Sequence, residues 1–372
     1  MHILFAGGGT AGHINPALAI AGYIKDKEPE TKISYIGTAR NLESLLVPAA
    51  GYDFYTIDVQ GFQRKLAPKS IIHNFVTVKK AISASNRARK LLKELSPDLV
   101  VGTGGYVSGP VLREAAKLGI KTAIHEQNAF PGVTTKALAN KVDRVMLAMP
   151  EAEKHMNLSK KPYVVGNPVR KELTEISRKE AREKLRLDAR PLILSFGGSL
   201  GARPINDAVV GLIESHNNSG KYYHIHAAGK AGFEYTNNRL KETCGTLASE
   251  ITIREYIDDM NVCMAAADLV ICRAGAITLS ELCLCGKASI LIPSPYVAEN
   301  HQYHNALTLK NKDAACLLEE KDLTKENLVS MVESLLLKGE TVKEMGEKAL
   351  KQSIPDSNER IYKILKELLA QN

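Results

Sequence analysis

The sequence predicts an α/β protein of two Rossmann-like, doubly wound domains that face a cleft. Short apolar strands alternate with helical stretches along the chain, and a strand, a glycine turn and a helix occur in succession near its start. A second unit of this kind opens the second half, about 190 residues later. Such alternation is typical of parallel sheets that helices cover on both faces. A length of 372 residues also favours two domains over one.

Short apolar runs mark the expected strands, and helical patterns lie between them. In the first half we expect strands at 3–6, 33–36, 99–101, 122–125 and 145–148, and helices at 16–27, 40–50, 71–95, 108–118 and 132–140. In the second half we expect strands at 191–196, 223–226, 251–254, 269–272 and 289–292, and helices at 177–187, 324–337, 341–351 and 359–369. Two prolines and a glycine within 162–168 predict a linker or hinge between the halves.

The composition is that of a globular protein, with 44% hydrophobic and 24% charged residues. No uncharged apolar run reaches the length of about 18 residues that a membrane-spanning helix needs, so none is expected. The six cysteines form no C-x-x-C pair and are expected to be reduced thiols in a cytosolic protein. The net charge of +8 comes entirely from residues 1–165, which hold 22 Lys and Arg against 13 Asp and Glu.

The first half is organised around the glycine turn at 7–13, between the first strand and the first helix. Asn15 is expected to cap that helix and Pro16 to begin it. Outward backbone N–H groups and the helix dipole together predict an anion site there. His13 closes the turn, where a neutral imidazole could act as a general base, although capping of the helix is an alternative role.

Gly7, Gly9 and Gly12 also satisfy the G-x-G-x-x-G pattern of dinucleotide-binding folds. That interpretation is disfavoured because the segment 37–40, after the second strand, lacks the acid that binds a ribose. Pro16 also places the expected helix start beyond the third glycine. NAD is therefore not expected, and neither is any other cofactor.

Two further polar stretches follow strands of the first half. Residues 102–110 form a glycine-dense turn that either lines the cleft or is a tight turn with positive φ. The segment His125–Asn128 follows the fourth strand, where burying four polar side chains without partners would be costly. We therefore expect it at the cleft, with Glu126 as a base or an orienting group and Asn128 bound to a polar ligand.

In the second half, the glycine turn at 197–201 and small residues at 273–281 permit close approach of a ligand to helix N-termini. Glu281 is expected one to two turns into its helix, either accepting hydrogen bonds from the vicinal hydroxyls of a sugar or simply solvated. His301 and His304 have helical spacing without carboxylates beside them, and no Asp-x-Asp triplet occurs, so no metal site is expected. Helix N-termini and backbone amides would then bind the charge of a diphosphate.

Residues 59–93 hold nine basic side chains and no acidic one. A helical stripe of apolar residues and the cations beside it are formed by Ile71, Phe75, Val78 and Ile82, with Lys79, Lys80, Arg87 and Arg89. Such a stripe is typical of a segment that lies on an anionic membrane surface, although packing on the domain is an alternative. Because aromatic residues make up 5% of the chain and no nucleic-acid-binding motif occurs, no nucleic acid partner is expected.

The order of the motifs resembles one family of bacterial glycosyltransferases from end to end. The shared segments are 8–13, 102–110, 125–128, 166–170, 197–202, 256–260 and 273–281. That family has the GT-B architecture and makes lipid II for peptidoglycan. The resemblance implies inverting transfer of N-acetylglucosamine from UDP-GlcNAc to the C4 hydroxyl of undecaprenyl-diphospho-muramyl-pentapeptide, lipid I, by a peripheral enzyme on the cytoplasmic face of the bacterial cell membrane.

The resemblance also implies which residues bind the donor. By matched motif they are Thr10, Ala11, Gly12, Asn128, Arg170, Ser199, Ile257, Ala276, Ile277, Thr278, Leu279, Ser280, Glu281 and Gln302. The nucleotide would lie in a domain at 166–354, with Glu281 on the ribose. The acceptor and the membrane would contact a domain at 1–165, on which the helix at 355–372 packs. Ala11 stands where the family usually has a glycine, and its methyl group hinders a positive φ.

Inversion requires a single displacement, hence one base that takes the proton of the acceptor hydroxyl and no covalent intermediate. His13 is the first choice for that base and Glu126 the second. Ser199 with its glycine turn, and Thr278 at a second helix N-terminus, are expected to stabilise the charge of the leaving UDP. Two alternatives stay open: a non-catalytic protein that binds a sugar nucleotide or a lipid headgroup, and a transferase with another lipid acceptor such as diacylglycerol.

Overall fold

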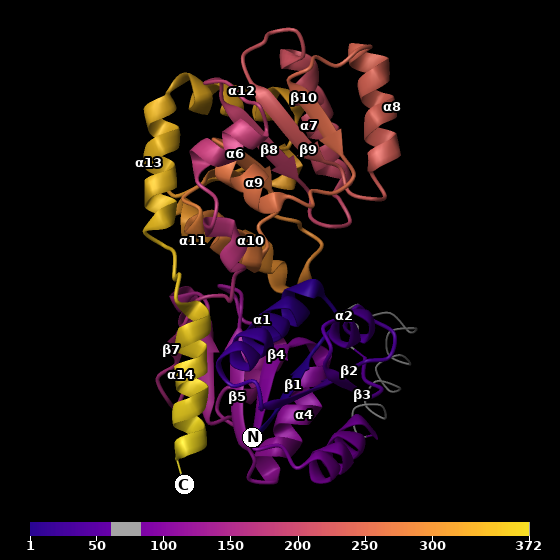
Figure 1. The fold of residues 1–372 in the computed structure, drawn as a ribbon, viewed down its shortest axis with the longest axis vertical. Helices are drawn as coiled ribbons and strands as arrows, with labels where there is room; N and C mark the ends of the chain where they lie inside the picture. Colours follow the sequence, from indigo (N-terminus) through magenta and orange to yellow (C-terminus); the bar gives the residue numbers. More distant parts are fainter. Residues whose placement is uncertain (61–82, 372) are drawn as a thin grey trace. The chain divides into compact units, whose positions relative to one another are not determined.

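The computed structural model describes residues 1–60 and 83–371 of the chain. These residues fold into two compact units, one of Met1–Val169 with Ile354–Asn372 and one of Arg170–Ser353. Each unit has its own parallel sheet, with helices in the connections between strands (Figure 1). The predicted class, α/β with two doubly wound sheets, is confirmed.

The first unit contains a seven-stranded parallel sheet in the order β3-β2-β1-β4-β5-β6-β7. Its strands are β1 (His2–Gly7), β2 (Lys32–Gly37), β3 (Asp53–Thr56), β4 (Leu99–Gly104), β5 (Lys121–Glu126), β6 (Arg144–Leu147) and β7 (Tyr163–Val164). Its helices are α1 (Ala11–Lys27), α2 (Glu43–Ala49), α4 (Gly105–Lys117), α5 (Val133–Leu138), the 3-10 helix η1 (Pro150–His155) and α14 (Ser357–Ala370), and residues 83–95 are also helical.

The second unit contains a six-stranded parallel sheet in the order β10-β9-β8-β11-β12-β13. Its strands are β8 (Leu192–Phe196), β9 (Tyr223–Ala227), β10 (Ile251–Arg254), β11 (Leu269–Cys272), β12 (Ala288–Leu291) and β13 (Cys316–Leu317). Its α-helices are α6 (Arg178–Lys184), α7 (Arg203–His216), α8 (Phe233–Cys244), α9 (Met260–Ala266), α10 (Ala276–Leu284), α11 (His301–Lys310), α12 (Lys325–Leu337) and α13 (Gly339–Leu350), with 3-10 turns η2 (Lys171–Thr174), η3 (Ala298–Asn300) and η4 (Glu320–Asp322).

In both sheets the strand order changes direction at the centre. The change falls between β1 and β4 in the first sheet and between β8 and β11 in the second. At such a switch point the following helices leave to opposite faces, and the crevice at the carboxyl ends of the strands is where open α/β sheets bind ligands. Each unit therefore has one position at which a site is expected.

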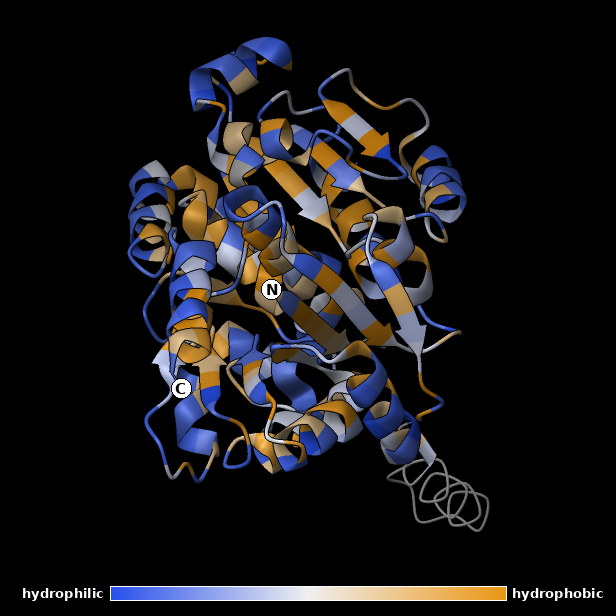
Figure 2. Cartoon of the chain, turned by 60° about the horizontal axis from the view of Figure 1, so that its bottom comes forward, coloured by the Kyte–Doolittle hydropathy of each residue, from blue (hydrophilic) through white to orange (hydrophobic). Residues whose placement is uncertain are grey.

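The central strands are buried on both faces, which explains their continuous apolar runs, drawn in orange in Figure 2. Along β1, Leu4 and Ala6 pack in one hydrophobic cluster, whereas Ile3 and Phe5 pack in the other. Helix α4 covers the first face, and α1 and α14 cover the second. A single strand thus holds both layers of helices in place.

The C-terminal helix α14 belongs to the first unit, although the whole second unit precedes it in the chain. The Ser357 hydroxyl donates to the carbonyl of Asn167 at 2.7 Å. Tyr362 and Lys366 both contact the Glu28 carboxylate of α1, at 2.6 and 2.7 Å. These contacts, with the apolar residues of α14 in the core, fix the helix on the sheet.

One expected helix boundary is wrong. Helix α1 begins at Ala11, with Thr10 as its N-cap, so Pro16 lies inside the helix instead of beginning it. Proline is tolerated there at the cost of one helical hydrogen bond, the one that its missing N–H would donate to the carbonyl of Gly12. Gly12 is therefore helical, and the position of Pro16 is no argument against a dinucleotide site; the missing acid after β2 remains one.

Three short strands, β3, β7 and β13, were not expected from the sequence. They have two to four residues, lie at or next to a sheet edge and are partly exposed, so no apolar run marks them. The pair Tyr163–Val164 falls inside the predicted linker and joins the sheet through β6.

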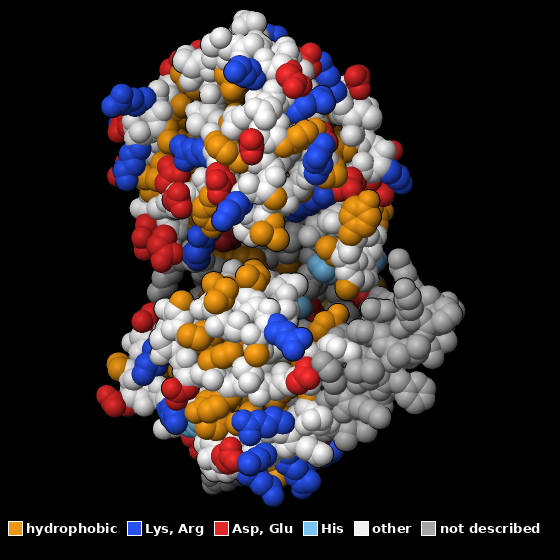
Figure 3. Space-filling model, turned by 90° about the vertical axis from the view of Figure 1, so that its right-hand side faces the viewer, with side chains coloured by type: hydrophobic (Ala, Val, Ile, Leu, Met, Phe, Trp, Pro, Cys, Tyr) orange, Lys and Arg blue, Asp and Glu red, His pale blue; other side chains and the backbone are white. Residues whose placement is uncertain are grey.

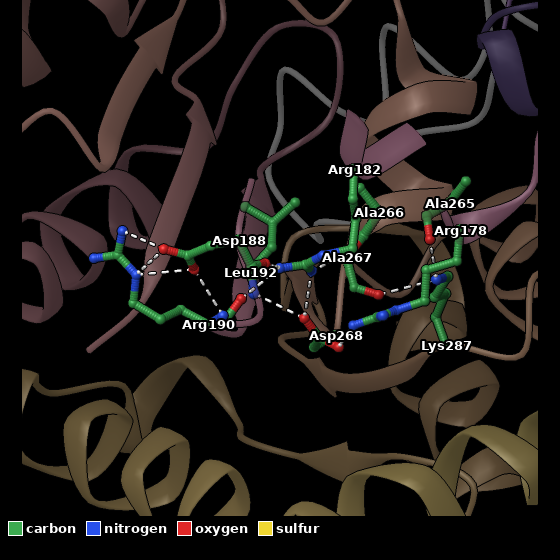
Figure 4. Close-up of polar contacts among 10 residues, drawn as sticks. All are labelled: Arg178, Arg182, Asp188, Arg190, Leu192, Ala265, Ala266, Ala267, Asp268 and Lys287. Atoms are coloured by element: carbon green, nitrogen blue, oxygen red, sulfur yellow. Dashed lines mark hydrogen bonds and ion pairs between the residues drawn. The ribbon is translucent and has the colours of Figure 1, made fainter. Parts of the chain in front are cut away.

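Charged side chains at the amino end of the second sheet join α6 and α9 to β8 and β11 (Figure 4). Arg182 is 7% exposed and donates to Asp268 Oδ2 at 3.1 Å and to the carbonyl of Ala266 at 3.2 Å. Lys287 donates to two carbonyl groups at the end of α9, both at 2.9 Å, and burial lowers its pKa to about 8. Cations at this position complement the dipole of α9. They lie opposite the ligand-binding end of the strands.

A chain of buried imidazoles crosses the core of the second unit. His216 Nε2 lies 3.2 Å from His224 Nδ1, and the Ser195 hydroxyl lies 2.8 Å from both His224 Nε2 and His226 Nδ1. Burial lowers the pKa of His216 and of His226 to about 4, and that of His224 well below its usual value. The three rings are therefore neutral in the folded protein near pH 7.

Because burial lowers the pKa of these three histidines, we expect the second unit to lose stability in mild acid. As the pH falls below about 6.5, the unfolded chain binds protons at these histidines, whereas the folded chain does so only near pH 4. The free energy of unfolding should fall by several kcal/mol between pH 6.5 and 4, at about 1.4 kcal/mol for each unit of pKa difference. Urea denaturation followed by circular dichroism measures this decline.

The variant His216→Gln keeps a group that can bond to His224 but lacks one of these titrations. Its free energy of unfolding should fall less steeply with pH than that of the wild type. Equal slopes would contradict the assignment.

Candidate functional site

At the switch point of the first sheet, the loops after β1 and β4 are in close contact. A Cβ atom on Gly105 would lie 2.2 Å from the Gly8 carbonyl oxygen, and one on Gly104 would lie 2.7 Å from His13 Cδ2. Gly104 and Gly105 also have φ values of +104° and +76°. Only glycine permits both the conformation and the approach. The glycines of the 102–110 segment therefore let the β4 turn pack against the loop that carries His13.

His13 is the third residue of α1 and is partly buried. Its Nδ1 lies 3.1 Å from the Gly8 carbonyl oxygen and 3.3 Å from the Thr10 hydroxyl. Because a carbonyl oxygen can only accept, Nδ1 carries the hydrogen of the neutral ring. Nε2 is then the nitrogen that can accept a proton, as a general base requires.

One N–H of the expected anion site at the first glycine turn is occupied by the protein itself. The Gly9 N–H donates to Glu43 Oε2 at 3.1 Å, and the Glu43 side chain comes from the first residue of α2. Glu43 is fully buried. A phosphate on this N–H would meet a carboxylate, so the Gly9 N–H is not available to an anion, whereas no side chain caps the N-terminus of α1 itself.

The neighbouring residues of the loop lie on the exposed side of the turn. Thr10 and Gly12 are exposed, and Ala11 is partly exposed. Ala11 has helical backbone angles as the first residue of α1, so its methyl group creates no strain. The substitution of the family's glycine at this position is therefore accommodated.

The segment His125–Asn128 is mostly buried, which corrects the expectation that it lies open in a cleft. His125, Glu126 and Gln127 are at most 3% exposed, and only Asn128 is partly exposed. His125 Nε2 donates to the carbonyl of Gly166 at 2.9 Å, and its Nδ1 accepts from the Gln127 amide at 3.0 Å. Burial lowers the pKa of His125. These polar groups join β5 to the 166–168 segment.

Glu126 orients the loop that follows β5. Its Oε1 accepts from the backbone and side-chain amides of Asn128, both at 3.1 Å. Its Oε2 accepts from the Gly132 N–H at 3.1 Å and from the Thr135 hydroxyl at 2.6 Å. Four donors occupy this carboxylate, which favours its role as an orienting group over that of a base.

At the switch point of the second sheet, the turn 197–202 leads from β8 into α7. Ser199 is exposed, and Gly198 and Gly201 have φ values of +98° and +79°. No side chain caps the N-terminus of α7. The N–H groups of its first turn, other than at Pro204, which has none, are therefore available to an anion.

Helix α10 begins at the same switch point, after β11. Gly275 is its N-cap, and no side chain caps the helix. Ala276, Ile277 and Thr278 form its first turn, followed by Leu279, Ser280 and Glu281. Two uncapped helix N-termini thus lie beside the two central strands of this sheet, an arrangement that suits a diphosphate.

Glu281 lies in the second turn of α10, at the depth predicted from the sequence. Arg170 donates to Glu281 Oε1 from NH2 at 3.2 Å and from Nε at 3.4 Å. The Glu281 side chain is 12% exposed and that of Arg170 is 58% exposed. Burial raises the pKa of Glu281, and Arg170 opposes that rise. The structure thus brings together two of the residues expected to bind the donor.

The remaining expected donor residues surround the ends of β10 and β12. Ile257 is buried, beside the exposed Tyr256. The Gln302 side chain accepts from the Ser294 N–H at 2.9 Å through its amide oxygen. This bond orients the amide of Gln302, because its oxygen is already engaged.

Three residues that support the sites at the two switch points were not assigned these roles from the sequence. Asn305, fully buried, donates to the carbonyl of Ala274 at 3.2 Å and so fixes the turn before α10. Arg273 pairs with Glu320 at 2.5 Å. Glu43 is the third. It supports the first unit, and its signal in the sequence was a lone acid within 42–47, a stretch that is otherwise apolar apart from Ser44.

The apolar stripe of the expected membrane segment lies outside the described residues, as do Lys79 and Lys80. In the described part, the helix at 83–95 packs Ala84, Ala88 and residues 91–92 in the core. Arg87 and Arg89 on its other face are exposed. Figure 3 shows Lys and Arg side chains gathered at the lower end of the first unit.

Within residues 1–60 and 83–371, no helix is long and apolar enough to span a membrane. Among the same residues there is no group of three or more His, Cys, Asp or Glu side chains that could hold a metal ion.

Two family descriptions match the chain. The glycosyltransferase family 28 N-terminal domain matches residues 3–147, and the C-terminal domain of that family matches residues 192–361.

Relatives of one name match nearly the whole chain. A protein from Acetivibrio thermocellus is 46% identical over 99% of this chain and 98% of its own length. One from Caldanaerobacter subterraneus is 43% identical over 98% of this chain and 99% of its own. Both are named UDP-N-acetylglucosamine–N-acetylmuramyl-(pentapeptide) pyrophosphoryl-undecaprenol N-acetylglucosamine transferase.

Solved structures share the architecture. The crystal structure of Acinetobacter baumannii MurG matches with a TM-score of 0.80 and 29% identity, over 98% of this chain and 99% of that one. The calicheamicin glycosyltransferase CalG4 matches with a TM-score of 0.71 at 16% identity, over 100% of this chain and 98% of its own, and supports the fold alone.

Because Arg170 holds Glu281 in place, we can predict the effect of removing the Glu281 carboxylate. If Glu281 accepts hydrogen bonds from the donor, Glu281→Ala should raise the KM for that donor roughly ten- to a hundredfold, the loss expected for hydrogen bonds to a charged group. The KM of the second substrate should stay unchanged, as should both constants in the control variant Glu333→Ala, an exposed glutamate of α12. Steady-state kinetics with each substrate varied in turn measures the effect. An unchanged donor KM would refute the assignment.

Proposed function

The chain belongs to glycosyltransferase family 28, and we propose that it transfers N-acetylglucosamine from UDP-GlcNAc to the C4 hydroxyl of undecaprenyl-diphospho-muramyl-pentapeptide, with inversion. It is a hexosyltransferase that converts lipid I to lipid II in peptidoglycan synthesis. The observation that carries this conclusion is the identity of 46% over 99% of the chain with a relative of that name. The N-termini of α7 and α10, which no side chain caps, supply an independent physical argument.

Chemistry at the donor consists of stabilising the leaving group. As the glycosidic bond to UDP breaks, negative charge develops on the diphosphate. The N-termini of α7 and α10, with the Ser199 and Thr278 hydroxyls, offer backbone and side-chain donors that need no rearrangement to receive this charge. Glu281, held by Arg170, would bind the ribose hydroxyls.

Chemistry at the acceptor requires one base. We assign it to His13, because its Nδ1 is bound to the Gly8 carbonyl and its Nε2 can accept the proton of the attacking hydroxyl. Glu126 is less suited, because four donors already occupy its oxygens. Thr10, Ala11 and Gly12 would then lie on the reaction side of the same loop.

The reaction is tested by UDP release from UDP-GlcNAc with different lipid acceptors. Release should require a lipid-linked muramyl-pentapeptide, and diacylglycerol should not support it. Release with diacylglycerol at the same rate would point to a different acceptor class. Donor binding without release in the presence of either acceptor would point to a non-catalytic binding protein.

Replacing the proposed base tests its role. His13→Ala should lower kcat roughly 10²–10⁴-fold, the usual contribution of a general base, with donor affinity preserved. The same assay on His155→Ala, which removes an exposed histidine of the first unit, should give wild-type rates. A loss of less than tenfold in His13→Ala, with intact donor binding, would remove His13 from this role.

We also propose that the enzyme is a peripheral protein of the cytoplasmic face of the cell membrane, bound through the basic stretch of the first unit. The exposed Arg87 and Arg89, and the cations that precede them in the sequence, support this location. Attraction to anionic lipids contributes about 1 kcal/mol for each cation near the surface and is screened by salt.

Charge reversal tests whether this basic stretch of the protein binds the membrane. The combined variant with Lys79, Lys80, Arg87 and Arg89 changed to Glu should no longer co-sediment with anionic vesicles at low salt. A matched variant reverses four exposed cations of the second unit: Lys221, Lys230, Arg239 and Lys241. It should bind the vesicles as the wild type does. Persistent binding of the first variant would place the membrane contact elsewhere.

A further inference from the structure

One peptide unit of the first glycine turn joins the buried carboxylate of Glu43 to the proposed base. The N–H of that unit belongs to Gly9 and donates to Glu43 Oε2 at 3.1 Å. Its C=O belongs to Gly8 and accepts from His13 Nδ1 at 3.1 Å. Carboxylate, peptide and imidazole therefore form one continuous chain of hydrogen bonds.

We propose that Glu43 is a positioning residue for His13, acting through the Gly8–Gly9 peptide to hold its ring in the Nδ1–H form with Nε2 ready to accept a proton. The catalytic importance of this arrangement rests on the proposed function, in which His13 is the base. Glu43 itself does not contact the substrate in this arrangement, since it is fully buried behind the turn.

The oxygens of Glu43 are surrounded by hydrogen-bond donors. Its Oε1 accepts from the Thr38 N–H at 3.1 Å and from the Thr38 hydroxyl at 2.6 Å, so all three groups bonded to its oxygens are donors. Tyr35 of β2 is a neighbouring titratable group, and burial together with the charge of Glu43 raises its pKa. These hydrogen bonds offset the cost of burying the polar oxygens of Glu43 and orient its side chain.

The glycines around Glu43 make room for its side chain. A Cβ atom on Gly8 would lie 2.5 Å from Glu43 Oε1, and one on Gly37 would lie 2.6 Å from Glu43 Cγ. On the other side of the peptide, Gly105 packs against the Gly8 carbonyl. The carboxylate and the β4 turn thus enclose the peptide unit from both sides.

A carboxylate bound to the N–H of a peptide increases the negative charge on the oxygen of the same peptide. Hydrogen bonds in such chains strengthen one another. The Gly8 oxygen becomes a stronger acceptor for Nδ1–H and stabilises the imidazolium that forms when Nε2 takes a proton. In catalytic triads a carboxylate does this by direct contact with the imidazole, fixing its tautomer. Here one peptide unit stands between the two groups.

The variant Glu43→Gln separates this role from simple support of the fold. The single amide oxygen of glutamine can keep both Thr38 donors, but its NH₂ group then faces the Gly9 N–H and cannot accept from it. The variant therefore removes the link to the peptide while it keeps the packing. Glu114→Gln is the matched control, because Glu114 is another buried carboxylate of the first unit that lies outside the site.

Two measurements test the proposal. In the wild type, ¹⁵N NMR of the His13 ring should show a protonated Nδ1 and an unprotonated Nε2, whereas Glu43→Gln should show a mixture of both tautomers. In the UDP-release assay, kcat of Glu43→Gln should fall roughly ten- to a hundredfold, less than for loss of the base itself, with both KM values within about twofold of the wild type. Glu114→Gln should change neither readout.

A double variant shows whether Glu43 acts through His13. Adding Glu43→Gln to His13→Ala should cause no further loss of kcat, because the group that Glu43 positions is already gone. An equal loss in both backgrounds would overturn the proposal, as would an unchanged tautomer in Glu43→Gln. If Glu43→Gln does not fold, the wild type still tests the proposal. An Nε2–H tautomer of His13 in the wild type would overturn it. A changed tautomer with unchanged kcat would support positioning by Glu43 and refute His13 as the base.

Discussion

Contact between the loops that follow β1 and β4 is the constraint on which the site of the first unit depends. The strand order reverses here, so α1 and α4 leave the sheet toward opposite faces and pack in different hydrophobic clusters. Their first turns nevertheless remain close, with Gly105 against the Gly8 carbonyl and Gly104 against the His13 ring. The position of His13 follows from this contact and not from the local sequence of α1.

The two glycine turns have the same local pattern, but a buried carboxylate bonds to one amide of the first turn. In the first unit, a carboxylate of the protein occupies the Gly9 amide, which excludes a phosphate from it. In the second unit, as at α1, no side chain caps the N-terminus of α7 or α10. A strand, a glycine turn and a helix therefore do not define an anion site until the surrounding side chains are known.

Buried polar residues at the end of β5 bond mainly to other segments of the first unit. His125 binds the carbonyl of Gly166, and Asn167 donates to the carbonyl of Gln127 and accepts from Ser357 of α14. Three segments that are far apart in the sequence meet in this network. The cost of burying these polar groups is offset by the bonds that the His125 ring, the Asn167 amide N–H and the Ser357 hydroxyl make to other segments.

The sequence by itself determined the fold class and most of the strands, because buried parallel strands have continuous apolar sequences. It also determined the reaction, because the motifs of the family occur in order. It also placed Glu281 at the correct depth of its helix. It did not reveal the start of α1. Proline is typical of the first position of a helix, whereas Pro16 lies inside α1. Only the tertiary structure decided which polar residues are exposed, as at His125–Asn128, and which carboxylate fills the first glycine turn. Those outcomes depend on hydrogen-bond partners from other strands and helices, such as Glu43 for Gly9, and no local pattern records them.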